Sequence, residues 1–197
     1  MCTNSRIYCI IPMLILTLSL AVGCGKKEIV SDITIDDFET KALKKIDDEG
    51  KLIVTETENG YEFVFDRYGE DQSWFTGTEK FDGIANKDRK IKKVTAVREN
   101  VNTEYFMEMT TADLVSDISD YENVPVTKLY GEMFLLDFGN VAGLFSPDTE
   151  ADDQFAPGLT ILMNARQAPQ TINGWRYTIE TAAEKDTVTI MAEYVGK

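Results

Sequence analysis

Apolar residues recur at helical spacing over residues 34–46, where the mainly polar part of the chain begins. Thr34 and Asp37 stand three positions apart, as a capping box requires at the start of a helix. Acidic residues fill the first turn and lysines follow them, which suits the helix dipole, and Gly50 provides a stop. The pattern therefore predicts an amphipathic N-terminal helix, which packs on a sheet through Ile35, Phe38, Ala42, Leu43 and Ile46.

Alternation of apolar and polar residues predicts strands in the next part of the chain. Strands at 51–57 and 61–67 flank Asn59-Gly60, a strong hairpin signal because both central residues of such a turn need positive φ. Residues 68–90 are polar and rich in turn formers, so we expect a loop there. Two more strands are predicted, at about 91–99 and about 103–110.

The second half of the chain predicts a short helix followed by further strands. The helix begins at Thr110 or Thr111 and ends before Pro125. Residues 126–138 are apolar at most positions, a pattern typical of a central strand buried on both faces. The remaining predicted elements are a Gly-, Pro- and acid-rich loop from Gly139 to Pro157, a strand at about 158–164, a turn at Asn173-Gly174, and a C-terminal hairpin whose arms carry Trp175, Tyr177 and Ile179, and Val188, Ile190 and Tyr194.

These elements predict the α+β class: a mainly antiparallel β-sheet with an N-terminal amphipathic helix and a second short helix. Residues 34–197 are long enough for one well-cored domain and short for two. We therefore expect a single domain over that range.

The first 25 residues have a different pattern. Arg6 precedes an uncharged apolar run over residues 7–22, which is shorter than the roughly 18 to 20 residues of a membrane-spanning helix. Such a run after a positive residue, ending in small residues, is typical of a secretory signal. The last part, Ala21-Val22-Gly23-Cys24, resembles the lipobox of bacterial lipoproteins, although that family usually has Leu where this chain has Ala21.

The resemblance implies that residues 1–23 are cleaved off and that the thiol of Cys24 carries diacylglycerol. Two acyl chains anchor a protein stably, whereas one binds a membrane only marginally. Residues 24–33 would then be the lipidated Cys and a short tether that reaches at most about 30 Å. The expected location is the extracytoplasmic face of the cell membrane. The alternative is an ordinary secreted protein with an unmodified Cys24.

Charge and residue usage exclude several functions. The cleaved segment contains Arg6 and no acid, so 19 basic and 34 acidic residues leave a net charge of −15 on the mature chain. This charge repels nucleic acid, and no nucleic-acid partner is expected. Cys2 and Cys9 lie in the signal, and the chain has no histidine. Catalysis by Ser-His-Asp or Cys-His, and zinc sites built on His or Cys, are therefore excluded.

Carboxylate chemistry and oxygen-ligand metals remain. The acidic run Asp148, Glu150, Asp152 and Asp153 offers oxygens to Ca²⁺ but lacks the spacing of an EF-hand, and a solvated loop is the alternative. Glycoside hydrolysis needs two carboxylates about 5 to 9 Å apart, a condition that some pair among 34 acids will meet in any fold. Trp74 and Phe75 lie in the polar loop and either stack on a sugar ring or plug the loop onto the core.

One cluster of cations stands out in this acidic chain: Lys87, Arg89, Lys90, Lys92 and Lys93. Lysines at a strand edge protect against aggregation. The functional alternative is a contact patch for anionic headgroups, wall polymer or an acidic partner, within reach because the tether is short.

The sequence therefore favours a lipid-anchored, extracytoplasmic envelope protein with a non-catalytic binding or interaction domain. Its partners would be the membrane, through the anchor, and an envelope protein or wall polymer. Two alternatives stay open: a small surface-anchored, carboxylate-dependent hydrolase of glycosidase type, and a structural domain stabilised by Ca²⁺.

Overall fold

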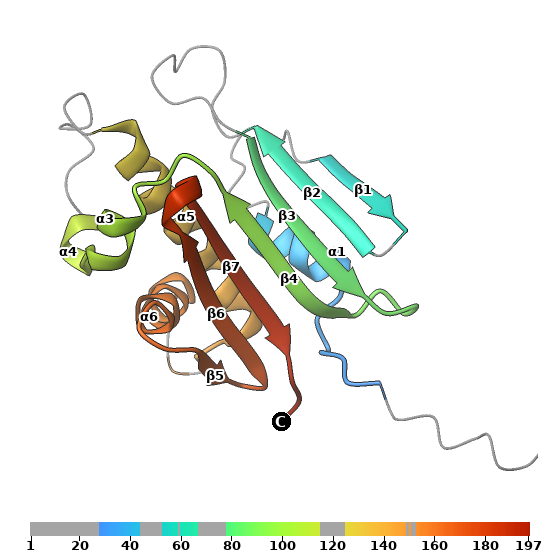
Figure 1. Ribbon diagram of the computed structural model, residues 1–197. Helices are drawn as coiled ribbons and strands as arrows, with labels where there is room; N and C mark the ends of the chain where they lie inside the picture. The colour runs from blue at the N-terminus through green and yellow to red at the C-terminus, as the bar shows by residue number, and fades with distance from the viewer. Residues whose placement is uncertain are drawn as a thin grey trace, which may run out of the picture.

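The structure is a computed structural model that describes residues 28–43, 53–58, 60–66, 78–114, 125–148, 150 and 153–197. Its centre is a seven-stranded antiparallel sheet with the strand order β1-β2-β3-β4-β7-β6-β5. The helices of the described chain lie on one face of this sheet, and none of them covers the other face (Figure 1). Sheet and helices form a single body, which confirms the predicted α+β class.

The first four strands form a meander. They are β1 (Ile53–Thr57), β2 (Gly60–Asp66), β3 (Thr78–Ala85) and β4 (Ile91–Arg98). The predicted hairpin is present with its turn one residue earlier than expected, because Thr57 pairs with Gly60. Gly60 has φ +155°, and a Cβ there would lie 2.1 Å from the carbonyl oxygen of Gly83, so only glycine fits.

Strand β3 corrects the expected loop at 68–90. Its sequence, TEKFDGIA, begins with three polar residues and contains Gly83, so it lacks the regular alternation that would indicate a strand. Gly83 has a packing reason, since a Cβ there would press on the Phe63 ring at 3.1 Å. Trp74 and Phe75, and with them the sugar-stacking hypothesis, lie outside the described residues.

The last three strands are β5 (Gln170–Ile172), β6 (Trp175–Ala182) and β7 (Thr187–Tyr194), with the 3-10 turn η3 (Ala183–Lys185) before β7. The predicted C-terminal hairpin is confirmed as β6 and β7. Asn173 and Gly174 form the turn before β6 with φ values of +52° and +84°. Both residue types tolerate this left-handed conformation, and Ile172 pairs with Trp175 across the turn.

Three predicted strands are wrong, because their segments are helical, and two of these helices are long. Helix α5 (Val126–Phe145) replaces the strand at 126–138, and helix α6 (Phe155–Ala165) replaces the strand at 158–164. A continuous apolar run indicates burial, but periodicity alone does not separate a buried strand from a buried helix. Twelve residues of α5 are buried, which explains why its sequence is apolar almost all round.

Glycines explain why the end of α5 resembled a loop. Gly139 and Gly143 lie one turn apart on α5 and face Gly158 of α6. A Cβ on Gly158 would lie 2.1 Å from the Gly139 oxygen and 2.5 Å from the Gly143 nitrogen. These glycines therefore allow two helix backbones to touch. The predicted loop from Gly139 to Pro157 is in fact helical up to Phe145 and again from Phe155.

The other helical segments are short. Helix α3 (Thr103–Glu108) stands where a strand at 103–110 was predicted, and the Asn102 side chain caps it by accepting from Tyr105 N at 2.9 Å. Helix α4 (Thr111–Leu114) begins at Thr111 as predicted, and the rest of that predicted helix lies outside the described residues. The aromatic residues in 103–110 occur in strands as well as in helices. The N-cap at Asn102 favours the helix.

The N-terminal helix begins with the predicted capping box. Helix α1 (Ile35–Phe38) has Thr34 as its N-cap and continues as the π-helical segment η1 (Glu39–Leu43). Thr34 Oγ1 accepts from Asp37 N at 3.1 Å, and Asp37 Oδ2 accepts from Thr34 N at 3.2 Å. Residues 44–50, including Gly50, lie outside the described residues, so the predicted end of the helix stays a prediction.

The core fills the space between the sheet and its helices. Phe38 of α1 packs edge-on against Phe63 of β2 with a centroid separation of 4.9 Å, as expected for a helix that lies on a sheet. Farther along, Phe145 of α5 stacks on Trp175 of β6 at 4.1 Å. The rings of Phe38 and Phe145 lie 5.7 Å apart, so aromatic contacts join the first and second halves of the chain in one core.

Candidate functional site

The N-terminal segment that precedes α1 is part of the fold. Residues 28–35 lie along the turn between β3 and β4, where Ser31 N donates to Ile91 O at 3.2 Å and Ile91 N donates to Ile33 O at 2.8 Å. Ile35 N donates to Arg89 O at 2.9 Å. The partner strand β7 pairs with β4 only from Lys93 onward, so the segment takes the place beside the first residues of β4. Residues 28–33, which belong to the short tether predicted over 24–33, are therefore docked on the turn between β3 and β4.

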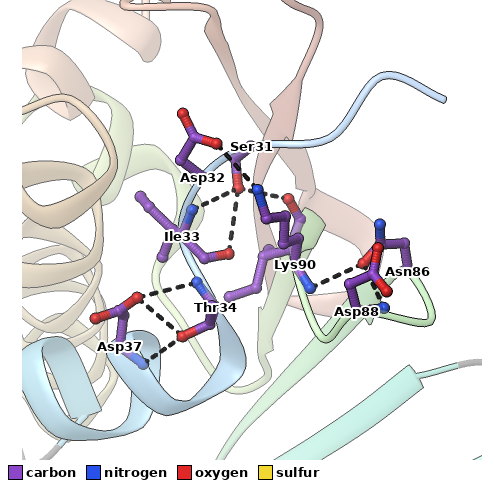
Figure 2. A network of polar contacts seen from close by, with 9 residues as sticks. Ser31, Asp32, Ile33, Thr34, Asp37, Asn86, Asp88 and Lys90 are labelled. Carbon is purple, nitrogen blue, oxygen red and sulfur yellow. Dashed lines mark hydrogen bonds and ion pairs between the residues drawn. The ribbon is translucent and has the colours of Figure 1, made fainter. Parts of the chain in front are cut away.

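Ser31 fastens this segment with its side chain as well as its backbone (Figure 2). Its hydroxyl donates to the carbonyl oxygen of Ile91 at 2.7 Å and accepts from Ile33 N at 3.2 Å. The residue is only 2% exposed. A serine that binds the backbone two positions ahead favours a local turn. Ser31 thus bends the segment toward α1 and ties it to β4.

The turn between β3 and β4 holds the basic cluster in place. Asn86 organises it, because its Oδ1 accepts from both Asp88 N and Lys90 N at 3.0 Å (Figure 2). Its backbone N–H donates to Lys90 O at 2.9 Å. Arg89 occupies the left-handed region with φ +59°, a conformation that costs a non-glycine residue about 1 kcal/mol. The turn is fixed by hydrogen bonds on both sides, so the cations project from a defined frame.

Three of the five cations bind acids of the docked segment and of α1. The pairs are Lys92 with Glu28, Lys90 with Asp32 at 3.1 Å, and Arg89 with Asp36 at 2.8 Å. The acids stand four positions apart, and their order along the chain is opposite to that of the cations. The bond from Lys92 lowers the pKa of Glu28, and the bond to Asp36 raises the pKa of Arg89. Arg89 also lies over the Tyr61 ring, 5.1 Å from its centroid.

This pairing changes the interpretation of the basic cluster. Arg89, Lys90 and Lys92 serve the chain's own acids, whereas Lys87 and Lys93 make no ion pair within the described part of the chain. Exposed pairs contribute only about 0 to 1 kcal/mol each. These ion pairs therefore determine where the segment aligns along β4. Its backbone hydrogen bonds and buried side chains supply most of the stability of the contact.

The sequence contained a signal for this arrangement. Glu28, Asp32 and Asp36 repeat at a spacing of four, across the boundary between the predicted tether and the start of the predicted helix. Five cations within seven residues needed counter-charges in an acidic protein, and this acidic repeat is the nearest regular source along the chain. Sequence reasoning missed the match because it treated residues 24–33 as a spacer.

The acidic run with candidate Ca²⁺ ligands makes local hydrogen bonds. Asp148 Oδ1 accepts from Glu150 N at 2.9 Å, and Asp153 Oδ1 accepts from Phe155 N at 3.1 Å. The side chain of Gln154 links the two ends of the loop, because it accepts from Asp148 N at 2.7 Å and donates to Asp148 O at 2.8 Å. No group of three or more potential metal ligands occurs among the described residues, and Asp152 lies outside them. The Ca²⁺ hypothesis stays a prediction.

Among the described residues, a buried carboxylate on α5 most resembles the general acid of an enzyme. Glu132 is almost fully buried and accepts a short 2.5 Å hydrogen bond from the hydroxyl of Tyr105. Burial raises the pKa of Glu132, and the negative charge of Asp113 raises it further, whereas the bonds from Tyr105 and the charge of Lys128 lower it. The ammonium of Lys128 lies over the Tyr105 ring at 4.3 Å. This cluster joins α3 to α5 inside the protein.

A shallow hollow of about 690 Å³ lies between the end of α5, the start of α6 and the turn before β6. Its walls are mainly apolar, and Asp148 is the one carboxylate among the residues that line it. A glycosidase needs two carboxylates across its substrate. Glu132 does not line this hollow, so the described residues do not place a carboxylate pair there.

The fold and the docked segment define an α+β protein whose N-terminal segment is built into the end of its sheet. No protein-family model, curated protein or solved structure matches the chain. In the part of the chain that the structure describes, none of the helices is both long and apolar enough to span a membrane.

Proposed function

We propose that this chain is a lipid-anchored envelope protein whose globular part is a non-catalytic binding domain on the extracytoplasmic face of the membrane. The lipobox-like stretch around Cys24 supports the anchor, and the absence of histidine and of a second thiol in the mature chain supports a role in binding. The amphipathic N-terminal helix begins directly after the docked segment.

The docked segment is the observation that carries the proposal. It begins at Glu28, so only residues 25–27 separate Cys24 from the folded body. Glu28 stands four positions after Cys24, so the two are at most about 14 Å apart. A lipid on Cys24 would therefore hold the domain directly at the membrane surface and restrict its orientation, which a free linker of nine residues would not do.

The uncovered face of the sheet is the surface that such a domain offers to a partner (Figure 1). Its outward residues mix both charges and threonine with two exposed apolar residues, Ile84 and Val97. Lys80 forms ion pairs with Glu62 and Asp82, and Thr95 stands opposite Asp82. Mixed polar faces are typical of antiparallel sheets with one solvated side. We therefore propose a reversible partner, an envelope protein or a wall polymer, and not an obligate subunit.

The anchor is tested by the mass of the N-terminal peptide of the protein isolated from its native membrane. The proposal predicts a chain that starts at Cys24 and carries diacylglycerol, and a Cys24→Ser variant that leaves the membrane fraction. Cys9→Ser is the matched control, because it removes a thiol from the signal and should leave anchoring unchanged. An unmodified Cys24, or a protein that retains residues 1–23 in the cytosol, would refute the anchor.

The binding role is tested by cross-linking on intact cells followed by identification of the captured species. The proposal predicts a discrete partner that is captured with the anchored protein and much less with Cys24→Ser. Capture that is equally strong for both forms would contradict a role that depends on the membrane.

A further inference from the structure

Three exposed apolar side chains from distant parts of the chain meet at one end of the sheet. They are Ile29 of the docked segment, Ile84 near the end of β3 and Val195 after β7, which are 57%, 42% and 41% exposed. Together with Lys92, Lys93 and Glu193 they line one hollow of about 390 Å³. Large aliphatic side chains gathered at a surface indicate a contact site.

This cluster, which we call the apolar edge (Ile29, Ile84 and Val195), lies beside the point where the described chain begins. Ile29 stands five positions after Cys24, so the two are at most about 18 Å apart. Ile29 packs near Gly196, since its Cγ2 lies 3.5 Å from the position of a Cβ on that glycine. The turn between β3 and β4, the docked segment and the C-terminus lie toward the lower right of the ribbon in Figure 1.

The lysines around the apolar edge are placed where their ammonium groups can reach the headgroup layer of a membrane. Lys93 lines the hollow, and Lys87 is exposed on the adjacent turn. Lysine side chains can lay their methylene stems on apolar surface and keep their ammonium groups in the headgroup layer. Glu193 opposes Lys93 across the strands, so the edge has no strong net charge and does not need anionic lipid.

We propose that the apolar edge is the membrane-facing surface of the domain, and that Ile29, Ile84 and Val195 enter the interfacial layer of the bilayer that holds the lipid of Cys24. This inference rests on the proposed lipid anchor. The short distance from Cys24 favours the bilayer over a protein partner, because an anchored domain presents this end to the lipid at very high local concentration. Apolar side chains at the interface bind in proportion to the apolar area that they bury.

The test uses the lipidated, full mature protein in vesicles of phosphatidylcholine. Because the lipid occupies the thiol of Cys24, each variant Ile29→Cys, Ile84→Cys or Val195→Cys has a single free thiol for an environment-sensitive fluorophore. Val97→Cys is the matched control, since Val97 is 44% exposed and lies on the same sheet, four residues beyond Lys93 on β4. That spacing moves the probe about 13 Å away from the edge.

The inference predicts a blue shift and an emission increase of about twofold or more at all three edge positions on transfer from detergent-free buffer to vesicles, with little change at Val97. Three probe positions guard against one variant that folds poorly. An equal response at position 97, or no response at the edge, would overturn the proposed orientation.

The same preparation separates this inference from the proposed anchor. The mass of each purified variant reports whether Cys24 carries diacylglycerol. A missing lipid would refute the anchor, and the orientation with it. A lipid that is present while the edge probes stay in water would refute the orientation alone.

Discussion

The hydroxyl of Ser31 donates a 2.7 Å hydrogen bond to the carbonyl oxygen of Ile91, sixty positions later in the chain. This contact joins the segment before the first helix to the first residue of a central strand. Because Ser31 is buried, removal of its hydroxyl would leave the contact without compensation by water. The same hydroxyl accepts from Ile33 N, so one side chain serves both the bend and the attachment.

Ser31→Ala is expected to reduce the free energy of unfolding by about 1 kcal/mol, because it removes one buried hydrogen bond and leaves Ile33 N without its partner. Urea unfolding of the mature chain measures this change. Thr171→Ala, at an exposed position of β5, is the control and should stay within about 0.5 kcal/mol of the parent. Equal effects at both positions would contradict an attachment that depends on Ser31.

The ion pairs of the docked segment should matter less than Ser31. A double-mutant cycle on Asp32→Asn and Lys90→Gln is expected to give a coupling energy of about 0.2 to 1 kcal/mol at low salt, because both side chains are exposed. The coupling should decline in 1 M NaCl, where charges are screened within about 3 Å. A coupling that exceeds the effect of Ser31→Ala and resists salt would reverse the ranking of these contacts.

The capping box makes a prediction about pH. Bonds from Lys41 and Thr34 lower the pKa of Asp37 from 3.8 to about 2. An acid with a lowered pKa stabilises the fold above its unfolded pKa, so this contribution is complete above pH 3.8 and is lost as pH falls through about 2. An NMR titration of the Asp37 carboxyl checks the value. A midpoint near 3.8 would mean that the cap is not formed in solution.

For Glu132 we expect the opposite dependence of stability on pH. Burial raises its pKa above 4.5, so the folded state binds the proton more tightly than the unfolded state, and stability falls as pH rises from 4.5 through the raised pKa. Glu132→Gln removes the charge and keeps an oxygen for the Tyr105 hydroxyl. We expect this variant to be more stable than the parent at pH 7, with an advantage that shrinks toward pH 4.5.

Thermal unfolding of both proteins over pH 4 to 8 measures this difference. Tyr105→Phe provides the matched comparison, because it leaves the buried carboxylate without its donor and should cost about 1 to 3 kcal/mol at pH 7. A Glu132→Gln variant that loses stability at pH 7 would show that the carboxylate is needed in its charged form.

The helix crossing predicts a severe glycine effect. Gly158→Ala is expected to cost about 3 kcal/mol or more, because its Cβ would meet the backbone of α5 at 2.1 Å and backbone cannot move aside easily. Gly131→Ala on α5 is the matched control, since its Cβ would meet only side chains at 3.1 Å and beyond. Urea unfolding should separate the two variants clearly. Similar costs would argue against a close backbone contact between α5 and α6.

The sequence predicted the local parts of the fold well. The capping box at Thr34 and Asp37 depends on two residues three apart, and the turn at Asn173-Gly174 depends on two adjacent residues that tolerate positive φ. Such signals act over a few positions, so tertiary contacts do not change them. The class of the fold followed from them.

The long buried helix could not be predicted in the same way. The run at 126–138 carries apolar residues on its partly exposed side as well as on its buried side, and this erases the period that separates a helix from a strand. Gly139 and Gly143 then resembled loop residues, although they serve the contact with Gly158. That contact joins positions distant in sequence, and no local pattern records it.

The candidate site was predicted in part. The basic cluster was recognised as the charge anomaly of the chain, but its counter-ions were not, because Glu28, Asp32 and Asp36 were divided between a tether and a helix. Pairing between segments depends on which side of β4 remains free, and this follows from the register of β7. The register is a property of the whole sheet.

The account depends most on the docked segment, because a domain that binds the residues just after Cys24 is held close to a lipid on Cys24. Amide hydrogen exchange of the mature, membrane-isolated protein tests this directly at Ser31, Ile35 and Ile91, whose N–H groups donate across the junction. The account predicts that these three amides exchange as slowly as their neighbours within β4. Exchange of Ser31 and Ile35 at the rate of an unstructured chain would contradict it.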